Sequence, residues 1–201
     1  MSGRRQNIGF TCCSSQAQKR PIFKHPERNL CLSSFFVLAW TGNKAILALF
    51  QELVMRLILQ RTDGVEVWID GAHHSATTSG LLILFGTRIG DREDSCGFLA
   101  DKAVNLRIFE DAEGKMNRSA LDIGAEVMIV SQFTLYADCR KGRRPSYSEA
   151  MAPAEAERLY NRFVELVAAN GLTTRTGVFG AKMKLKFTND GPVTILLEHD
   201  N

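Results

Sequence analysis

The sequence predicts an α+β fold: a largely antiparallel or mixed β-sheet, barrel-like in its core, with two main helices. Strand-like runs outnumber helical ones, several neighbouring runs are separated only by short turns, and two longer stretches carry apolar residues at helical spacing. With 201 residues and an apolar fraction of 45%, the chain is suited to one domain with an appendage.

The first half of this domain is predicted to hold a hairpin, a buried strand and a helix. It begins with two short β-like runs, 56–61 and 65–69, and Asp70-Gly71 is typical of a hairpin turn. The continuous apolar run 80–85 predicts a strand that is buried on both faces. We expect a helix over 92–105, with Asp91 as its N-cap.

The second half is predicted to return to strands around a second helix. This helix begins near Pro153, because proline is favoured at the first helical position, and ends before Gly171. Its apolar stripe indicates packing against the core. The predicted strands are 106–109, 126–133, 173–177, 183–187 and 193–197.

Residues 1–54 differ in composition from residues 55–201, so we expect an N-terminal extension followed by one domain. The extension holds seven Lys or Arg and two Asp or Glu, whereas the domain holds eighteen and twenty. Nucleic-acid binding by the domain therefore requires a local basic patch. Three interpretations of the extension stay open: a dispensable segment, an organellar targeting segment and a packed accessory element.

We expect a cytoplasmic protein, or an organellar one if the extension is a targeting signal. The apolar runs of the extension are too short to span a membrane, so no membrane association is predicted. The five cysteines are odd in number and form no C-x-x-C pair, which is typical of a reduced compartment.

The domain lacks the residues for several common hydrolytic and cofactor sites. Its histidines are His73, His74 and His199, of which two fall in a predicted hairpin loop. A Ser-His-Asp triad or a zinc-activated water is therefore not expected. Since the sequence also lacks a phosphate-binding glycine loop between a strand and a helix, we predict neither a metal nor a cofactor.

Two motifs carry the candidate chemistry. Ser131-Gln-Phe-Thr134 ends a predicted buried strand, which would hold polar groups at the rim of a rigid backbone. Asn189-Asp-Gly-Pro-Val-Thr194 places Gly191-Pro192 between two strand-like runs. Taken alone, Ser131 and Thr134 would be ordinary strand hydroxyls, and the Gly-Pro bond would be trans.

With three further motifs in the same order, these segments resemble the D-aminoacyl-tRNA deacylase family over about residues 55–200. The further motifs are Gly114-Lys-Met-Asn117, Cys139-Arg-Lys-Gly-Arg-Arg-Pro-Ser146 and Gly177-Val-Phe-Gly-Ala-Lys-Met183. The resemblance implies a deacylase-like fold and hydrolysis of the ester bond of D-aminoacyl-tRNA, and of mischarged glycyl-tRNA. Free D-amino acid and tRNA would be released, which is chiral proofreading in translation.

The resemblance also implies roles for the first motif. The backbone N–H groups of Phe133 and Thr134 would stabilise an oxyanion, while Ser131 and Gln132 would organise the terminal adenosine or the pocket. Because no histidine is placed to activate Thr134, we expect it to position the substrate, with nucleophilic attack by its hydroxyl as the alternative. From their residue types, Phe179 and Met183 are expected either to line the adenosine pocket by stacking or to pack in the core.

The second motif implies a homodimer in which Gly191-Pro192, joined by a cis bond, enters the active site of the partner subunit. Its carbonyls would face the α-amino group of the substrate and leave no room for an L side chain.

The cations Arg140, Lys141, Arg143 and Arg144 would contact phosphates near the 3′ end of the tRNA, although a solvated loop has the same composition. The alternative function is a non-catalytic nucleic-acid-binding module on the same fold.

Overall fold

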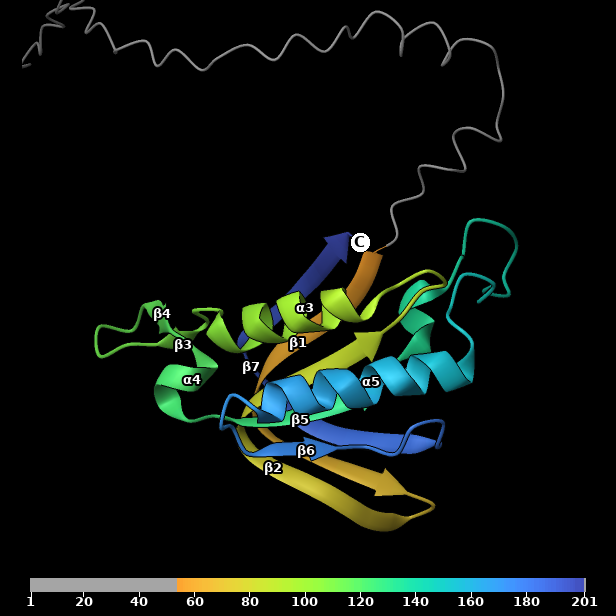
Figure 1. Cartoon of the computed structure of the whole chain (residues 1–201). Helices are drawn as coiled ribbons and strands as arrows, with labels where there is room; N and C mark the ends of the chain where they lie inside the picture. The colour runs from red at the N-terminus through yellow and green to blue at the C-terminus, as the bar shows by residue number, and fades with distance from the viewer. Residues whose placement is uncertain (1–53, 201) are drawn as a thin grey trace, which may run out of the picture. The chain divides into compact units, whose positions relative to one another are not determined.

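The computed structural model describes residues 54–200, of which Asp200 is described by its backbone alone. The expected extension, up to residue 53, lies outside the described residues. Within the described range, five strands form one sheet in the order β6-β5-β2-β1-β7 (Figure 1). They are β1 (Val54–Ile69), β2 (Ala72–Gly86), β5 (Glu126–Ser131), β6 (Thr174–Thr176) and β7 (Met183–Asp200).

The predicted fold class is confirmed. β1 pairs antiparallel with β2 and β7, whereas β5 pairs parallel with β2 and β6, so the sheet is mixed. The two long helices are α3 (Glu93–Asn105) and α5 (Pro153–Ala168). The described range also holds the short helix α4 (Ala120–Ile123), the 3-10 helix η2 (Phe133–Tyr136) and a separate hairpin of β3 (Phe109–Glu110) and β4 (Met116–Arg118).

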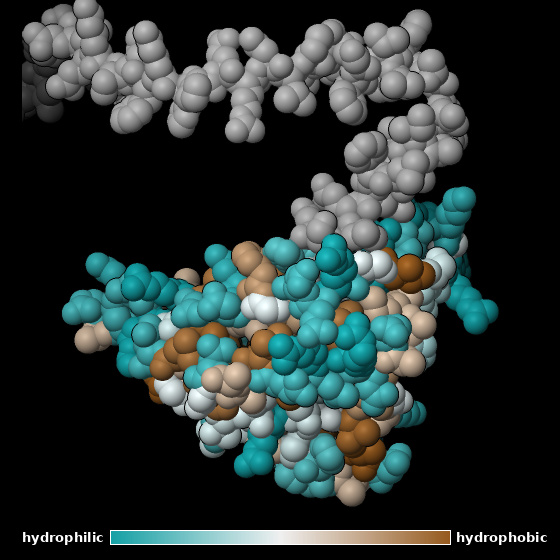
Figure 2. Space-filling view, in the orientation of Figure 1, coloured by the Kyte–Doolittle hydropathy of each residue, from teal (hydrophilic) through white to brown (hydrophobic). Residues whose placement is uncertain are grey.

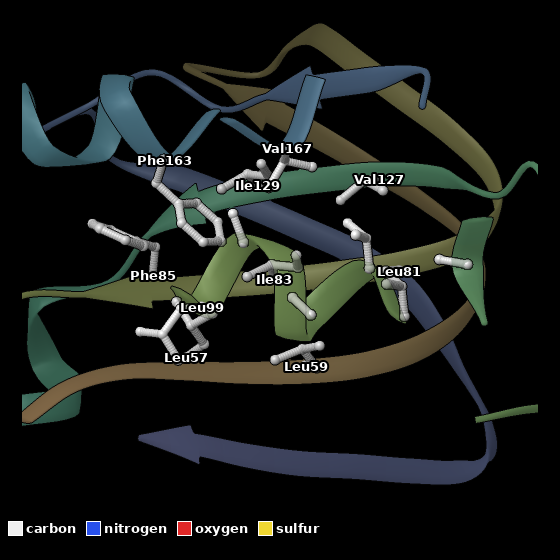
Figure 3. Packing of buried hydrophobic residues seen from close by; sticks show 14 of the residues in the cluster. Leu57, Leu59, Leu81, Ile83, Phe85, Leu99, Val127, Ile129, Phe163 and Val167 are labelled. Carbon is white, nitrogen blue, oxygen red and sulfur yellow. The ribbon is translucent and has the colours of Figure 1, made fainter. Parts of the chain in front are cut away.

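The main core lies between one face of the sheet and the two long helices, which run beside each other across it (Figure 1). Alternate residues of a strand point to the same face, so β1 and β2 contribute residues two positions apart. Figure 3 shows these side chains in one layer with Leu99 of α3 and Phe163 of α5, and all are almost fully buried: Leu57, Leu59, Leu81, Ile83 and Phe85. Burial of each contributes about 1.5–3 kcal/mol.

A second, smaller core lies on the opposite face of the sheet. Leu82 of β2 and Met128 of β5 point away from the helices and contact the outer part of the β1–β2 hairpin, including Val65 and Val67. The hairpin thus curves back over the sheet, and the Ser75 hydroxyl donates to the Thr176 carbonyl at 2.8 Å.

Gly80 lies opposite Glu126 at the start of the parallel pairing between β2 and β5, where the two backbones are close. A Cβ at this position would lie 1.9 Å from the carbonyl oxygen of Glu126, so only glycine allows the two backbones to approach. The predicted Asp70-Gly71 turn is confirmed, with φ of 50° and 84°, and it joins strands that are longer than expected. The runs 56–61 and 65–69 are one strand.

Several local predictions were wrong. Asp91 does not cap α3; its carboxylate accepts from the Arg88 N–H at 2.7 Å, and the N-cap is Arg92. The stretch 106–109 is strand only at Phe109, because Leu106 N–H still makes the last helical bond to the Lys102 carbonyl, and the helix ends where Leu106 turns to an extended ψ of 129°. His73 and His74 lie within β2 rather than in a loop, and the His73 ring meets the Trp68 ring at 5.3 Å.

The face seen in Figure 2, which carries the long helices, is largely hydrophilic with small separate apolar patches. Between α3 and α5, Arg162 pairs with Glu93 at 2.9 Å. Among the described residues, no helix has the length and apolar character needed to cross a membrane.

Candidate active site

A mainly apolar cavity of about 460 Å³ opens beside the carboxyl end of β5. Its walls come from β2, the 3-10 helix η2, the loop before α5, the start of α5 and the loop after β6. The residues that matter for the argument are Phe85, Ser131, Gln132, Phe133, Tyr147 and Phe179. A cavity of this size and character is typical of a site for a small ligand or part of a larger one.

The first motif lies at this cavity, but its backbone differs from the prediction. β5 ends at Ser131 instead of continuing to residue 133. The Gln132 N–H donates to the Phe85 carbonyl at 2.7 Å, and the chain then turns into η2, where Leu135 N–H donates to the Gln132 carbonyl at 3.3 Å. Gly86 makes room for this turn, because a Cβ there would lie 3.1 Å from Leu135.

The turn presents two backbone donors. Phe133 and Thr134 are the first two residues of η2, where N–H groups have no acceptor within a 3-10 helix. In the described part of the chain, neither N–H donates to another group. Both are therefore available to an acceptor bound beside them.

The side chains of the motif are divided between the cavity and the turn. Ser131, Gln132 and Phe133 line the cavity, whereas Thr134 does not. The Thr134 hydroxyl instead accepts a hydrogen bond from the Gln132 side-chain amide. The Phe133 ring is 58% exposed and meets the Tyr147 ring edge-on at 5.0 Å, so an aromatic pair stands at the cavity mouth.

Of the two predicted pocket residues, the structure brings one to the cavity. Phe179 is in the lining, and its ring lies 6.0 Å from that of the buried Tyr160. Met183 packs instead against the second core, and its sulfur lies 2.5 Å from the place where a Cβ on Gly177 would be. Gly177 is therefore required for this packing.

The Gly191–Pro192 peptide bond is cis, as predicted, and lies within β7. Gly191 has φ of 117°, which favours glycine. The Asn189 side chain fixes the segment, since it accepts from the Val193 N–H at 2.9 Å and donates to the Thr194 hydroxyl at 2.9 Å. Neither Gly191 nor Pro192 lines the cavity of its own chain.

Arg61 is the residue of this region that the sequence reasoning missed. Its side chain is 8% exposed, pairs with Asp190 at 2.8 Å and donates to the Ile108 carbonyl at 2.8 Å. A buried guanidinium without such partners would be costly. The signal in the sequence was that Arg61 continues the alternation of Leu57 and Leu59, so a cation stands on the face of β1 that points into the core.

The basic cluster lies on the loop that also reaches the cavity. Arg140 is paired with Asp138 at 2.8 Å, and its hydrogen bonds hold the pKa of Asp138 down at about 2. Lys141, Arg143 and Arg144 are exposed. Because Tyr147 of the same loop lines the cavity, the three exposed cations lie a few residues from its mouth.

Burial raises the pKa of two tyrosines and one cysteine in the described part of the domain. Desolvation raises the pKa of Tyr160, whose hydroxyl donates to the Ile129 carbonyl at 2.8 Å, and of Tyr136, whose hydroxyl donates to the Val54 carbonyl. It also raises the pKa of Cys96 to about 12. Among residues 54–199, no cluster of three or more His, Cys, Asp or Glu is arranged to hold a metal.

Residues 58–198 match a family model described as D-Tyr-tRNA(Tyr) deacylase. The D-aminoacyl-tRNA deacylases of Thermomicrobium roseum and Thermosipho africanus are 52% and 49% identical over 144 residues, which cover 72% of this chain and 94% and 97% of theirs.

Two solved structures are also similar. The c-Myc DNA Unwinding Element Binding Protein has a TM-score of 0.69 and 36% identity over 73% of this chain and 100% of that one. A probable eukaryotic D-amino acid tRNA deacylase has a TM-score of 0.64 and 18% identity, again over 73% and 100%, and supports the fold alone.

Proposed function

The chain belongs to the D-aminoacyl-tRNA deacylase family, and from this membership we infer that it hydrolyses the ester between a D-amino acid and tRNA. The products are free D-amino acid and tRNA, so the enzyme removes D-amino acids from wrongly charged tRNA before translation uses it. The observation that carries this function is the match of residues 58–198, because it includes both site motifs.

We propose that the reaction uses backbone groups rather than a side-chain nucleophile. Water adds to the ester carbonyl, the oxygen of the tetrahedral intermediate accepts from the Phe133 and Thr134 N–H groups, and the intermediate collapses with the ribose oxygen as leaving group. That oxygen takes up the proton that the water gives up, with the neighbouring ribose hydroxyl as a group able to relay it. An activated ester held in this geometry requires little more than positioning and oxyanion stabilisation.

The apolar cavity is proposed to take the terminal adenosine. Bases of single-stranded RNA stack on aromatic side chains, and Phe133, Tyr147 and Phe179 all lie on the cavity wall. Ser131 and Gln132 supply polar groups beside them. Met183 is proposed to act indirectly, by packing under the Gly177 segment that carries Phe179.

The chiral gate is proposed to act between subunits of a homodimer. In the sheet order, β7 stands three strands from β5, which is roughly 14 Å to the side at the usual strand spacing. Gly191-Pro192 is thus remote from the cavity of its own chain. On the sheet face opposite the helices, Leu196 is 55% exposed, and such a residue is suited to burial against a second copy.

The exposed cations Lys141, Arg143 and Arg144, together with Arg140, are proposed to bind tRNA phosphates. This loop is a local basic patch on a domain whose overall charge is slightly acidic, which fits contact with the backbone of a nucleic acid. Residues 55–201 are proposed to hold all groups needed for hydrolysis, so that residues 1–54 are not required.

Single-turnover hydrolysis of D-aminoacyl-tRNA tests this function. The full chain should release the D-amino acid much faster than the spontaneous rate measured without enzyme. The alternative of a non-catalytic nucleic-acid-binding module predicts retention of the tRNA in a binding assay with no release above background.

A further inference from the structure

One arginine, Arg56, contacts the C-terminal half of the 3-10 helix η2. Arg56, near the start of β1, donates from its guanidinium to the Leu135 carbonyl at 3.1 Å. The same guanidinium lies over the Tyr136 ring, 5.0 Å from its centroid. A carboxylate fixes its orientation, since Arg56 Nε is 2.7 Å from Glu198 Oε1 near the end of β7.

These contacts engage the half of η2 opposite to the proposed oxyanion donors. Leu135 is the third of four residues in η2, and the last carbonyls of a helix need partners from outside it. A cation beside those carbonyls is favourable, because they carry the negative end of the helical dipole. The Tyr136 hydroxyl adds a second tie to β1 through the Val54 carbonyl. The C-terminal half of η2 is therefore attached to β1, and through Glu198 to β7.

The position of Arg56 is poorly suited to direct contact with the substrate. It borders a second cavity of about 450 Å³ that also includes Arg88 and Arg140. Each of these arginines is paired with a carboxylate, in turn Glu198, Glu149 and Asp138, so the charge of Arg56 is already matched by Glu198. The contacts of Arg56 are directed at the turn.

We propose that Arg56, oriented by Glu198, is a positioning residue for ester hydrolysis: it fixes η2 so that the Phe133 and Thr134 N–H groups point at the reacting carbonyl. This inference rests on the proposed role of those two N–H groups. Nothing reacts with Arg56 itself. Its effect is on the rate of the chemical step, because a small displacement of an oxyanion donor is costly.

The test compares Arg56→Met with Arg162→Met in the full chain. Arg162 is a matched control, since its side chain is 43% exposed against 38% for Arg56, and it too pairs with carboxylates, but on the outer side of α5. Three quantities are measured for each variant: the single-turnover rate with D-aminoacyl-tRNA, the same rate with D-aminoacyl-adenosine, and the affinity for uncharged tRNA.

Arg56→Met should lower both rates by the same factor, about ten- to a hundred-fold, and leave tRNA affinity unchanged. Arg162→Met should change none of the three. Arg56→Lys should recover part of the rate, because it keeps the charge but lacks the fork that reaches both Leu135 and Glu198. If Arg56→Met does not fold, Glu198→Gln, which removes only the carboxylate that orients Arg56, should lower both rates in the same way.

The inference is overturned if the rates of folded Arg56 and Glu198 variants equal that of the wild type. It is also overturned if the loss with tRNA is explained by weaker tRNA affinity, or if Arg162→Met loses as much. A wild type that does not hydrolyse D-aminoacyl-tRNA would instead refute the proposed function, so the two failures are distinct.

Discussion

At the scale of single residues, the site is notable for how few reactive side chains it brings together. The Thr134 hydroxyl accepts from Gln132, lies outside the cavity lining and has no histidine among its hydrogen-bond partners. The Phe133 and Thr134 N–H groups, by contrast, are free to donate. The sequence motif pointed to residues that lie at the cavity, but the availability of the Phe133 and Thr134 N–H groups depends on the turn at Gln132, which no local pattern predicted.

Thr134→Ala should therefore keep measurable hydrolysis of D-aminoacyl-tRNA, because both backbone donors remain. Single-turnover rates are compared with wild type after folding and tRNA binding have been checked. A folded, tRNA-binding Thr134→Ala without activity, or a trapped acyl-Thr134 species, would restore Thr134 as the nucleophile.

A comparison of Phe133→Pro with Phe133→Ala tests the backbone donor itself. Both variants lose the aromatic ring, but only Phe133→Pro also loses the backbone N–H. Phe133 is the first residue of η2, a position where proline is tolerated. Phe133→Pro should be slower than Phe133→Ala by about 10²–10³, the usual cost of one oxyanion donor. Equal rates would remove this N–H from the mechanism.

The buried Tyr160 predicts a loss of stability at alkaline pH. Its pKa is raised above the ordinary value of 10.0, mainly by burial, so the folded state holds the phenol proton more tightly than the unfolded state does. The resulting stabilisation is complete below pH 10 and is lost as the pH rises from there towards the folded pKa. Tyr136, shifted in the same direction, adds to the effect.

Urea unfolding between pH 8 and about 11 measures this dependence. Tyr160→Phe should cost about 1 kcal/mol at pH 8, because the bond to the Ile129 carbonyl is lost, and its stability should fall less steeply above pH 10 than that of the wild type. An identical slope in both proteins would contradict the assignment.

At the scale of elements, the spacing of apolar residues predicted the long helices and most strands. It missed the features that depend on a single contact. The two long helices and most strands are where apolar spacing placed them. The end of β5 at Ser131 was missed because the apolar pattern continues, while the Phe85 carbonyl takes the Gln132 N–H and redirects the chain. The short helix α4 was also missed, although Ser119 and Asp122 form a capping box at its start.

The close approach of β2 to β5 at Gly80 gives a sharp test of packing. Gly80→Ala should destabilise the fold by a few kcal/mol, about 1–3 or more, because its Cβ would meet the Glu126 backbone at 1.9 Å. Gly97→Ala in α3 is the matched control: no atom lies within 4 Å of the new Cβ, and alanine favours the helix by about 1 kcal/mol. Chemical denaturation should show opposite signs for the two substitutions, and a neutral Gly80→Ala would refute the close approach.

The basic loop makes a prediction about salt. Removing Arg143 and Arg144 together should weaken tRNA binding equally for D- and L-charged forms and reduce the slope of log affinity against log salt by about two. The control removes two exposed cations from α3 and its N-cap, Arg92 and Lys102, and should leave the slope unchanged. An unaltered slope in the first variant would show that the loop is only solvated.

At the scale of the whole molecule, one chain carries both site motifs but keeps them apart. The cavity lies at the end of β5, while Gly191-Pro192 lies across the sheet and is anchored there by Arg61 and Asp190. The sequence contained both motifs, yet their separation within a chain follows from the strand order, which depends on long-range pairing. This separation is the physical basis for the proposed homodimer.

The measurement that tests the central claim most directly is the ratio of single-turnover hydrolysis rates for the D- and L-aminoacyl forms of one tRNA, in wild type and in Gly191→Ala. A Cβ on Gly191 would lie 2.9 Å from the Arg61 guanidinium and from Val193, so the segment must shift. We expect a large D-to-L ratio in wild type and a much smaller one in the variant, with the D-rate less affected than the L-rate. A wild type that hydrolyses both forms equally, or a variant with the ratio of the wild type, would contradict a D-selective deacylase gated by Gly191-Pro192.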